Sequence, residues 1–503
     1  MIYDLLEDAV RKWGNKPAVI CNGNIKTYSE LSNMVELIAD ELKKYKGTAD
    51  NNILLAMDNS MEFVESFFAI NKAGGTIIPL YMNMGESKLK SIIEHYEIRC
   101  ILTLKKYKNK IELALEESVN HLEKVFYIED TGSSVTIEIF DYKPALTDGP
   151  YYRGNSPGII LFSSGTTNLP KGIMLSNNNI ISNVEAISEY LSLTSEDKIL
   201  LMKNINHSSS ITGELLVSIH NGCLLHIQAG FITAASIMDA ISKHKITILF
   251  GVPTILTAMI THGEFNNFDM KSLRIINFYG ASMAIHKIRE LAEKFPEVDL
   301  IYSYGLTEAA PRVTYIKRED LLSKEGSSGM PIKGVEVKIM VDQREAEAFE
   351  QGEICVKGPN VMMGYYKNEE KTKAVLADGY LLTGDLGWLD AEGYLYVKGR
   401  KDNMIIKSGK NIYPEEIEAV LMGYPEMKEV LVRGEADELV GEEIVAYVVA
   451  DGEEALNLFQ VLKHCKKALE DYKVPGKIYQ VKELKKTLSN KIMRKQVFGE
   501  VLK

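Results

Sequence analysis

Short apolar runs alternate with helix-like segments through roughly the first 320 residues of this 503-residue chain. The segments 60–74 and 176–191 carry apolar residues at helical spacing, which predicts amphipathic helices between strands. Such alternation predicts α/β layers with largely parallel sheets. The predicted strands lie at 52–57, 75–80, 98–104, 158–163, 223–227, 246–250 and 273–280.

The pattern changes after about residue 330. Short alternating strands set between glycine turns predict a β-rich subdomain over about 330–400. Further on, Pro414 suits the start of a helix and Gly423 its end. The fold class we expect is α/β, with a large N-terminal domain of layered sheets (1–401) that includes the β-rich subdomain, and a small mobile α+β C-terminal domain (402–503).

Composition restricts the function. The net charge of −11 argues against a general nucleic-acid binder, although it leaves room for an anion in a local basic pocket. The five cysteines lack the spacing of a metal site or disulfide framework, which favours a reducing compartment. No run of 18 apolar residues occurs, and the N-terminus reads as an amphipathic helix rather than a signal peptide. We therefore expect a cytoplasmic enzyme without a membrane span.

The stretch "SSGTTNLPKG" (163–172) has the composition of a phosphate-binding loop and follows a predicted strand. Gly172, not Ser or Thr, follows Lys171, so the stretch is not a Walker sequence. Its hydroxyls, backbone N–H groups and one ammonium group still suit a triphosphate. Taken alone, such a stretch is more often an ordinary turn.

Four further blocks follow the loop in order. They are "SYGLTEAA" (303–310), "TGDLGWLD" (383–390), "GRKDNMIIKSGKNIYPEEIE" (399–418) and "TLSNKIMRK" (487–495). Together with the loop they resemble the adenylate-forming superfamily, in particular its acyl-CoA synthetase branch, over nearly the whole chain. The resemblance implies that a carboxylic acid reacts with ATP to give an acyl-adenylate and pyrophosphate. It further implies transfer of the acyl group to coenzyme A, with ATP, Mg²⁺ and coenzyme A as cofactor and cosubstrates.

The resemblance also implies roles for residues. Tyr304 would stack on adenine, Thr307 would contact the α-phosphate, and Glu308 would hold Mg²⁺, which prefers hard oxygen ligands. Lys491 would be the catalytic lysine of the first half-reaction, and Asp402 the hinge about which the C-terminal domain rotates. The full ATP-binding set is Ser163, Ser164, Gly165, Thr166, Thr167, Lys171, Gly280, Ala281, Tyr304, Gly305, Thr307, Asp385, Arg400 and Lys491.

Three departures from the family pattern stand out. Asn168 and Asn490 occupy positions that are usually glycine, and asparagine is the residue that best replaces glycine in the left-handed region. The third departure is "MKNINHSSS" (202–210), which is polar where the family often has an apolar run ending in histidine. No aspartate occurs between 202 and 213, which argues against an amino-acid substrate.

The expected acid site is less constrained. His207 would belong to it as a catalytic or pocket residue, although a core histidine bonded to backbone is equally consistent with its position. Ile211, Val252 and Met283 could line the pocket, and core packing explains them equally well. The partners we expect are a small carboxylic acid and coenzyme A, with no nucleic acid. The alternatives are a ligase that loads a phosphopantetheinylated acyl carrier protein and, less favoured, a non-enzymatic scaffold.

Overall fold

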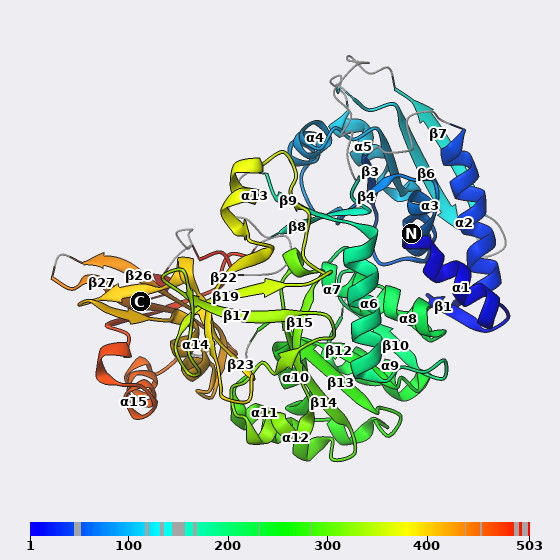
Figure 1. Cartoon of the computed structure of the whole chain (residues 1–503). Helices are drawn as coiled ribbons and strands as arrows, with labels where there is room; N and C mark the ends of the chain where they lie inside the picture. Colours follow the sequence, from blue (N-terminus) through cyan, green and yellow to red (C-terminus); the bar gives the residue numbers. More distant parts are fainter. Residues whose placement is uncertain are drawn as a thin grey trace.

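The computed structural model describes most of the chain. The described residues are 1–44, 52–115, 119, 121–130, 135–142, 156–163, 169–230, 232–281, 283–437, 439–452, 455–486, 492–494 and 501–502. Within them the strands form four sheets, and the fold is mixed α/β with a large N-terminal and a small C-terminal domain, as predicted (Figure 1).

The first sheet has the strand order β16-β15-β14-β13-β12-β10-β11-β1-β2 and is parallel through its centre. Antiparallel strands close both edges. Its central strands are short, apolar and buried on both faces, as expected where helices cover a parallel sheet. The strands are β1 (Pro17–Cys21), β2 (Asn24–Thr27), β10 (Lys198–Leu201), β11 (Leu224–Ile227), β12 (Ile248–Gly251), β13 (Ile275–Tyr279), β14 (Asp299–Gly305), β15 (Arg312–Ile316) and β16 (Met330–Pro331).

The second sheet has the order β20-β9-β8-β4-β3-β5-β6-β7, again with a parallel centre. Strands β8 and β9 form an antiparallel hairpin whose ends pair Ser163 with Lys171. The phosphate-loop candidate is therefore the connection of this hairpin. The strands are β3 (Asn52–Ala56), β4 (Thr76–Leu80), β5 (Cys100–Leu104), β6 (Lys124–Asp130), β7 (Val135–Asp141), β8 (Ile159–Ser163), β9 (Lys171–Leu175) and β20 (Gly364–Tyr365).

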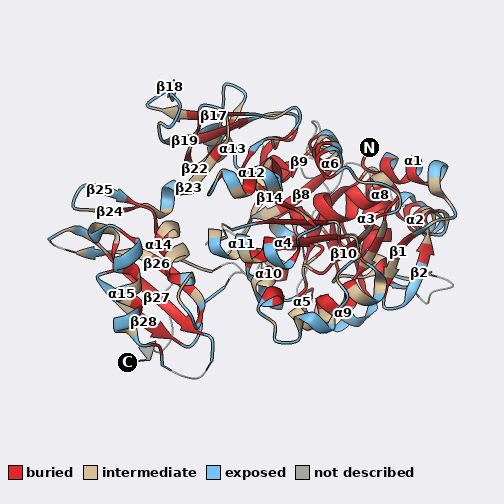
Figure 2. Cartoon of the chain, turned by 90° about the horizontal axis from the view of Figure 1, so that it is seen from below, coloured by how far each residue is buried: buried red, intermediate tan, exposed pale blue. Residues whose placement is uncertain are grey.

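Helices cover both parallel sheets. Helix α3 begins where the Ser60 hydroxyl accepts a hydrogen bond from the Phe63 amide, and most of its residues are buried because it lies deep in the core. The buried side chains cluster in the strands and on the inward faces of the helices (Figure 2). The helices of the large domain are α1 (Tyr3–Trp13), α2 (Tyr28–Lys43), α3 (Met61–Lys72), α4 (Glu86–His95), α5 (Lys108–Ala114), α6 (Asn177–Leu191), α7 (Ser208–Ser210), α8 (Val217–Asn221), α9 (Ala234–His244), α10 (Pro253–Ile260), α11 (Ile285–Lys294), α12 (Arg318–Ser323) and α13 (Glu369–Val375). Within the described residues, every helix is too short or too polar to cross a membrane.

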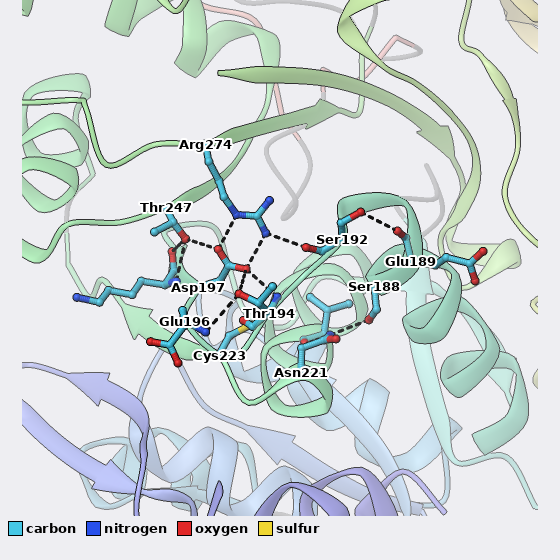
Figure 3. Close-up of polar contacts among 12 residues, drawn as sticks. Ser188, Glu189, Ser192, Thr194, Glu196, Asp197, Asn221, Cys223, Thr247 and Arg274 are labelled. Carbon is cyan, nitrogen blue, oxygen red and sulfur yellow. Dashed lines mark hydrogen bonds and ion pairs between the residues drawn. The ribbon is translucent and has the colours of Figure 1, made fainter. Parts of the chain in front are cut away.

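A buried carboxylate ties together the amino ends of the parallel strands in the first sheet. Asp197, just before β10, accepts hydrogen bonds from Arg274 Nε and Nη2 at 2.7 and 2.6 Å (Figure 3). It also accepts from the hydroxyl of Thr247 and the backbone amide of Thr194. Burial alone would raise the pKa of Asp197. The hydrogen bonds from these donors outweigh that effect, so the pKa of Asp197 is lowered. This network lies at the strand ends opposite to those that form the site described below.

The third sheet is antiparallel and corresponds to the predicted β-rich subdomain. Its strands are β17 (Glu336–Val341), β18 (Arg344–Glu345), β19 (Gly352–Lys357), β21 (Leu376–Ala377), β22 (Tyr380–Leu389) and β23 (Leu395–Arg400). The predicted boundary residue Asp402 lies in a short 3₁₀ turn (Lys401–Asn403) between this sheet and the next.

The fourth sheet and two helices form the C-terminal domain. Helix α14 (Pro414–Met422) starts at Pro414 and is followed by Gly423, as predicted from those two residues. Helix α15 is Leu458–Ala468. The strands are β24 (Ile405–Lys407), β25 (Lys410–Ile412), β26 (Met427–Asp437), β27 (Gly441–Ala450), β28 (Lys477–Val481) and β29 (Val501–Leu502).

Candidate active site

A large cleft opens at the carboxyl ends of the parallel strands, where open α/β sheets bind ligands. Its volume of about 2210 Å³ is sufficient for more than one small molecule. Several predicted residues line it because each follows or ends a strand or begins a helix at this edge. They are Val252, Gly280, Ala281, Gly305, Thr307 and His207.

Two of these positions require glycine. Gly280 has φ +91°, in the left-handed region that side chains rarely adopt. A Cβ on Gly305 would lie 1.8 Å from the Pro311 carbonyl oxygen, closer than any side chain can approach. The backbone itself therefore forms this part of the cleft wall.

Tyr304 and Asp385 are in contact although they come from different sheets. The Tyr304 hydroxyl donates a hydrogen bond to Asp385 Oδ2, and Arg400 Nη1 donates to Asp385 Oδ1 at 2.9 Å. Burial raises the pKa of Asp385, since the carboxylate is only 7% exposed. Burial and the nearby Asp385 carboxylate together raise the pKa of Tyr304 well above its usual value. The structure thus brings together the three residues predicted for adenine and ribose.

Thr307 lines the cleft beside the start of helix α7. Its Oγ1 atom lies 3.2 Å from Ser208 Oγ, within hydrogen-bonding distance. His207 caps the short helix α7, where its Nδ1 accepts a hydrogen bond from the Ser209 amide and lies 2.9 Å from Ser209 Oγ. The residues expected at the α-phosphate and in the acid pocket are therefore adjacent.

Opposite charges gather around the phosphate-loop hairpin. Lys371 of α13 contacts Lys171 and lies close to Glu308 and Asp402. Burial and the neighbouring Lys171 lower the pKa of Lys371 to about 8, although the two carboxylates act in the opposite direction. Sequence reasoning missed Lys371, because nothing in "NEEKTK" distinguishes it from a solvated helix lysine.

Glu308 is held in place at this end of the cleft. Its Oε1 accepts a hydrogen bond of 3.1 Å from the Tyr365 hydroxyl. A single fixed carboxylate fits Mg²⁺, which commonly takes one or two carboxylates and completes its coordination with substrate phosphates and water. The donor set therefore suits a nucleotide-bound Mg²⁺ rather than a cage built wholly from protein.

The C-terminal domain also reaches the cleft. Lys486 and Met493, on either side of position 491, line it. Arg494 anchors this segment: Nη1 and Nη2 donate to the two Glu418 carboxylate oxygens at 2.8 and 2.6 Å. The predicted residues outside the described part of the chain are Ser164, Gly165, Thr166, Thr167, Asn168, Asn490 and Lys491, and Ser163 is described only in its backbone.

Two residues proposed for the acid pocket lie elsewhere. Ile211 is fully buried in the main hydrophobic core, and Met283 packs against a second core cluster. Packing therefore accounts for both, whereas Val252 and His207 line the cleft. Two charged residues that were not predicted as site residues, Lys203 and Arg312, line the cleft, and the buried Glu214 pairs with Lys203.

Comparison with known proteins identifies the class. Residues 6–366 match the family model "AMP-binding enzyme", and residues 416–491 match "AMP-binding enzyme C-terminal domain". The chain belongs to this family of adenylate-forming enzymes. It is thus an AMP-forming acid–thiol ligase that uses ATP, Mg²⁺ and coenzyme A, as the sequence blocks predicted.

Individual relatives cover nearly the full chain. A 2-succinylbenzoate–CoA ligase of Bacillus licheniformis is 31% identical, over 95% of this chain and 96% of the relative. An indoleacetate–CoA ligase of Aromatoleum aromaticum is 30% identical, over 94% and 92%. The solved o-succinylbenzoate CoA synthetase of Bacillus subtilis, in complex with its acyl-adenylate intermediate, is 26% identical. It superposes with a TM-score of 0.83 over 98% of this chain and 97% of that structure.

Proposed function

We propose that this chain activates a small carboxylic acid, with the roles of the site residues as follows. The carboxylate attacks the α-phosphorus of ATP, the bond to the β-phosphate oxygen breaks, and pyrophosphate leaves. The thiol of coenzyme A then attacks the acyl carbon of the adenylate, releasing AMP and giving a thioester. The observation that carries the proposal is a cleft in which Thr307, expected at the α-phosphate, lies within hydrogen-bonding distance of Ser208, the neighbour of His207.

Each role follows from position and charge. Tyr304 would present its ring to adenine, and Asp385 would accept hydrogen bonds from the ribose hydroxyls. Lys171 and Lys371 would face the terminal phosphates, and Thr307 the α-phosphate. Glu308 would hold Mg²⁺, which would offset the charge of the triphosphate.

The C-terminal domain would act in both half-reactions. Lys491 would lie between the carboxylate and the α-phosphate, reducing their repulsion and orienting the attack. It would then have to leave, because the thiol needs access to the adenylate. Rotation about Asp402, in the short turn between the third and fourth sheets, would accomplish the exchange.

The relatives act on aryl-bearing acids among others, and we propose an acyl or aryl acid for this chain. The test is ATP–pyrophosphate exchange with a panel of fatty, aromatic, dicarboxylic and amino acids, followed by mass spectrometry of products. The proposal expects exchange with at least one acid and a coenzyme A thioester. Thioester found only on a phosphopantetheinylated carrier protein would contradict coenzyme A as acceptor, and absence of exchange with every acid would contradict the activity.

The proposed compartment is the cytoplasm. All five cysteines are free and buried in the structure. Burial raises the pKa of each thiol, for example to about 11 in Cys21, which keeps the thiols protonated and unreactive. Fractionation of the native host with an antibody to this chain tests the assignment, and recovery in a secreted fraction would contradict it.

A further inference from the structure

Arg312 is a buried guanidinium at the acid end of the cleft. It begins strand β15, is 2% exposed and lines the cleft. Neither its Nε nor its Nη2 has a hydrogen-bond partner among the described residues. The Tyr190 hydroxyl accepts one hydrogen bond from this guanidinium. Because a buried charge with unpaired donors is costly, the two unpaired nitrogens favour a further anionic partner.

The neighbouring carboxylate is already engaged. Glu214, fully buried on the π-helical turn Ile211–Leu216, forms an ion pair with Lys203 and accepts a 3.0 Å hydrogen bond from Tyr279. Both bonds go to Glu214 Oε1, while Oε2 has no partner among the described residues. Arg312 instead stacks on the Tyr279 ring, with Cζ 3.7 Å from the ring centroid.

The local charge balance favours an added anion. Lys203, Glu214 and Arg312 carry two positive charges and one negative, and Glu214 and Arg312 are buried. Burial lowers the pKa of Arg312 and raises the pKa of Glu214, as expected where charges are incompletely compensated. Ser210, whose buried hydroxyl also lacks a partner among the described residues, lines the cleft as well.

Two other arginines have acceptors that compensate the charge of the guanidinium. Arg274 has both Asp197 oxygens and the Ser192 carbonyl as acceptors (Figure 3). Arg318 donates to the three backbone carbonyls of Ala292, Phe295 and Val298. Arg312 differs from both because it lines the cleft and its Nε and Nη2 have no protein acceptor among the described residues.

We propose that Arg312 binds a second anionic group of the acid, so that the site selects a dicarboxylic acid over its monocarboxylic counterpart. The inference rests on the proposed function and specifies its substrate class. The reacting carboxylate would lie near Thr307, and the second carboxylate would accept hydrogen bonds from Arg312 and Ser210. Without its ion pair to Lys203, Glu214 would repel the second carboxylate. The Lys203–Glu214 ion pair therefore has a positioning role.

The experiment compares acids that differ in one group. ATP–pyrophosphate exchange is measured with glutarate against valerate and with terephthalate against 4-methylbenzoate. We expect kcat/KM to favour a diacid by at least about tenfold, because a buried group left unpaired discriminates strongly against the analogue that lacks its partner. Exchange only with monocarboxylic acids would overturn the inference and leave the activity standing, whereas no exchange with any acid would overturn both.

Substitution of Arg312 locates the effect. In Arg312→Gln, kcat/KM for the diacid should fall on the order of 100-fold, the loss typical of a broken buried charge pair. The kcat/KM for the monoacid should fall less than about threefold. Arg312→Lys should recover part of the diacid activity. If ATP and Mg²⁺ still raise the melting temperature of a variant as they do for the wild type, the variant is folded.

The matched control is Arg318→Gln, which removes an arginine that only bridges backbone carbonyls. It should lower the melting temperature and leave the ratio of diacid to monoacid kcat/KM unchanged. If Arg312→Gln lowers the two kcat/KM values equally, Arg312 is a structural residue and the inference is wrong.

Discussion

Tyr304 donates a hydrogen bond to Asp385, and this contact joins strand β14 of the first sheet to strand β22 of the third. The two residues are 81 positions apart in the chain, yet both sequence blocks that contain them were predicted to bind the nucleoside. Their contact brings two residues of the predicted ATP-binding set together.

Replacing Asp385 should weaken nucleotide binding selectively. In Asp385→Ala we expect KM for ATP to rise about 10- to 100-fold, equivalent to the loss of a hydrogen bond to a charged group. Tyr304→Phe keeps the ring and removes only the hydroxyl, so its KM for ATP should rise less than about fivefold. Initial rates of pyrophosphate exchange measure both. An equal rise in the KM for the acid in Asp385→Ala would point to general misfolding.

The contact between Lys371 and Lys171 should make stability depend on pH. The folded protein holds the pKa of Lys371 at about 8, below the usual lysine value of about 10.4. Between these values the unfolded chain binds more protons at this residue, so its contribution to stability rises as pH increases from about 8 to about 10. Urea unfolding of the wild type and Lys371→Gln across this range measures the difference. The rise should be weaker in the variant, and parallel curves would contradict the lowered pKa.

The Asp197 network should contribute to stability and not to catalysis. Asp197→Asn should lower the free energy of unfolding by about 2–3 kcal/mol at pH 7, because Arg274 loses its charged acceptor. Glu196→Gln, at an exposed neighbour, should change it by less than about 0.5 kcal/mol. The folded pKa of Asp197 is lowered, so its stabilisation is complete above the unfolded value of about 3.9 and is lost as pH falls through the folded pKa. A constant difference between wild type and Asp197→Asn down to pH 2 would argue against this account.

A substitution at the proposed hinge residue should affect the two half-reactions differently. Asp402→Pro restricts the backbone of the turn between the third and fourth sheets. We expect it to leave pyrophosphate exchange within about threefold of the wild type and to slow thioester formation at least about tenfold, since only the second step needs rotation. The two steps are measured separately. Pyrophosphate exchange measures the first, and thioester formed from a supplied acyl-adenylate, quantified after quenching, measures the second. Equal loss of both would indicate misfolding instead.

Local patterns in the sequence predicted most of the fold. The run at 273–280 contains β13, and Pro414 with Gly423 bounds α14, because short-range propensities and caps determine such elements. Ordered sequence blocks supplied the expected nucleotide-binding residues. Three of these, Tyr304, Asp385 and Arg400, are in contact in the structure, and their binding of ATP stays a prediction.

The acid end could not be predicted in this way. Arg312 and Glu214 lie about a hundred residues apart, and neither stands in a recognisable motif. Their significance comes from burial and missing partners, which only the folded chain shows. The signal in the sequence was the unusual polarity of 202–210, and it did not point to Arg312.

The most direct test of the account is to measure both half-reactions in Lys491→Ala, with Lys485→Ala as a control at an exposed lysine nearby. Acyl-adenylate formed from acid and ATP, and acyl-CoA formed from supplied acyl-adenylate, are quantified by mass spectrometry. The account predicts that Lys491→Ala loses adenylation by at least about 100-fold while thioester formation stays within about threefold of the wild type. Normal adenylation in Lys491→Ala would contradict it.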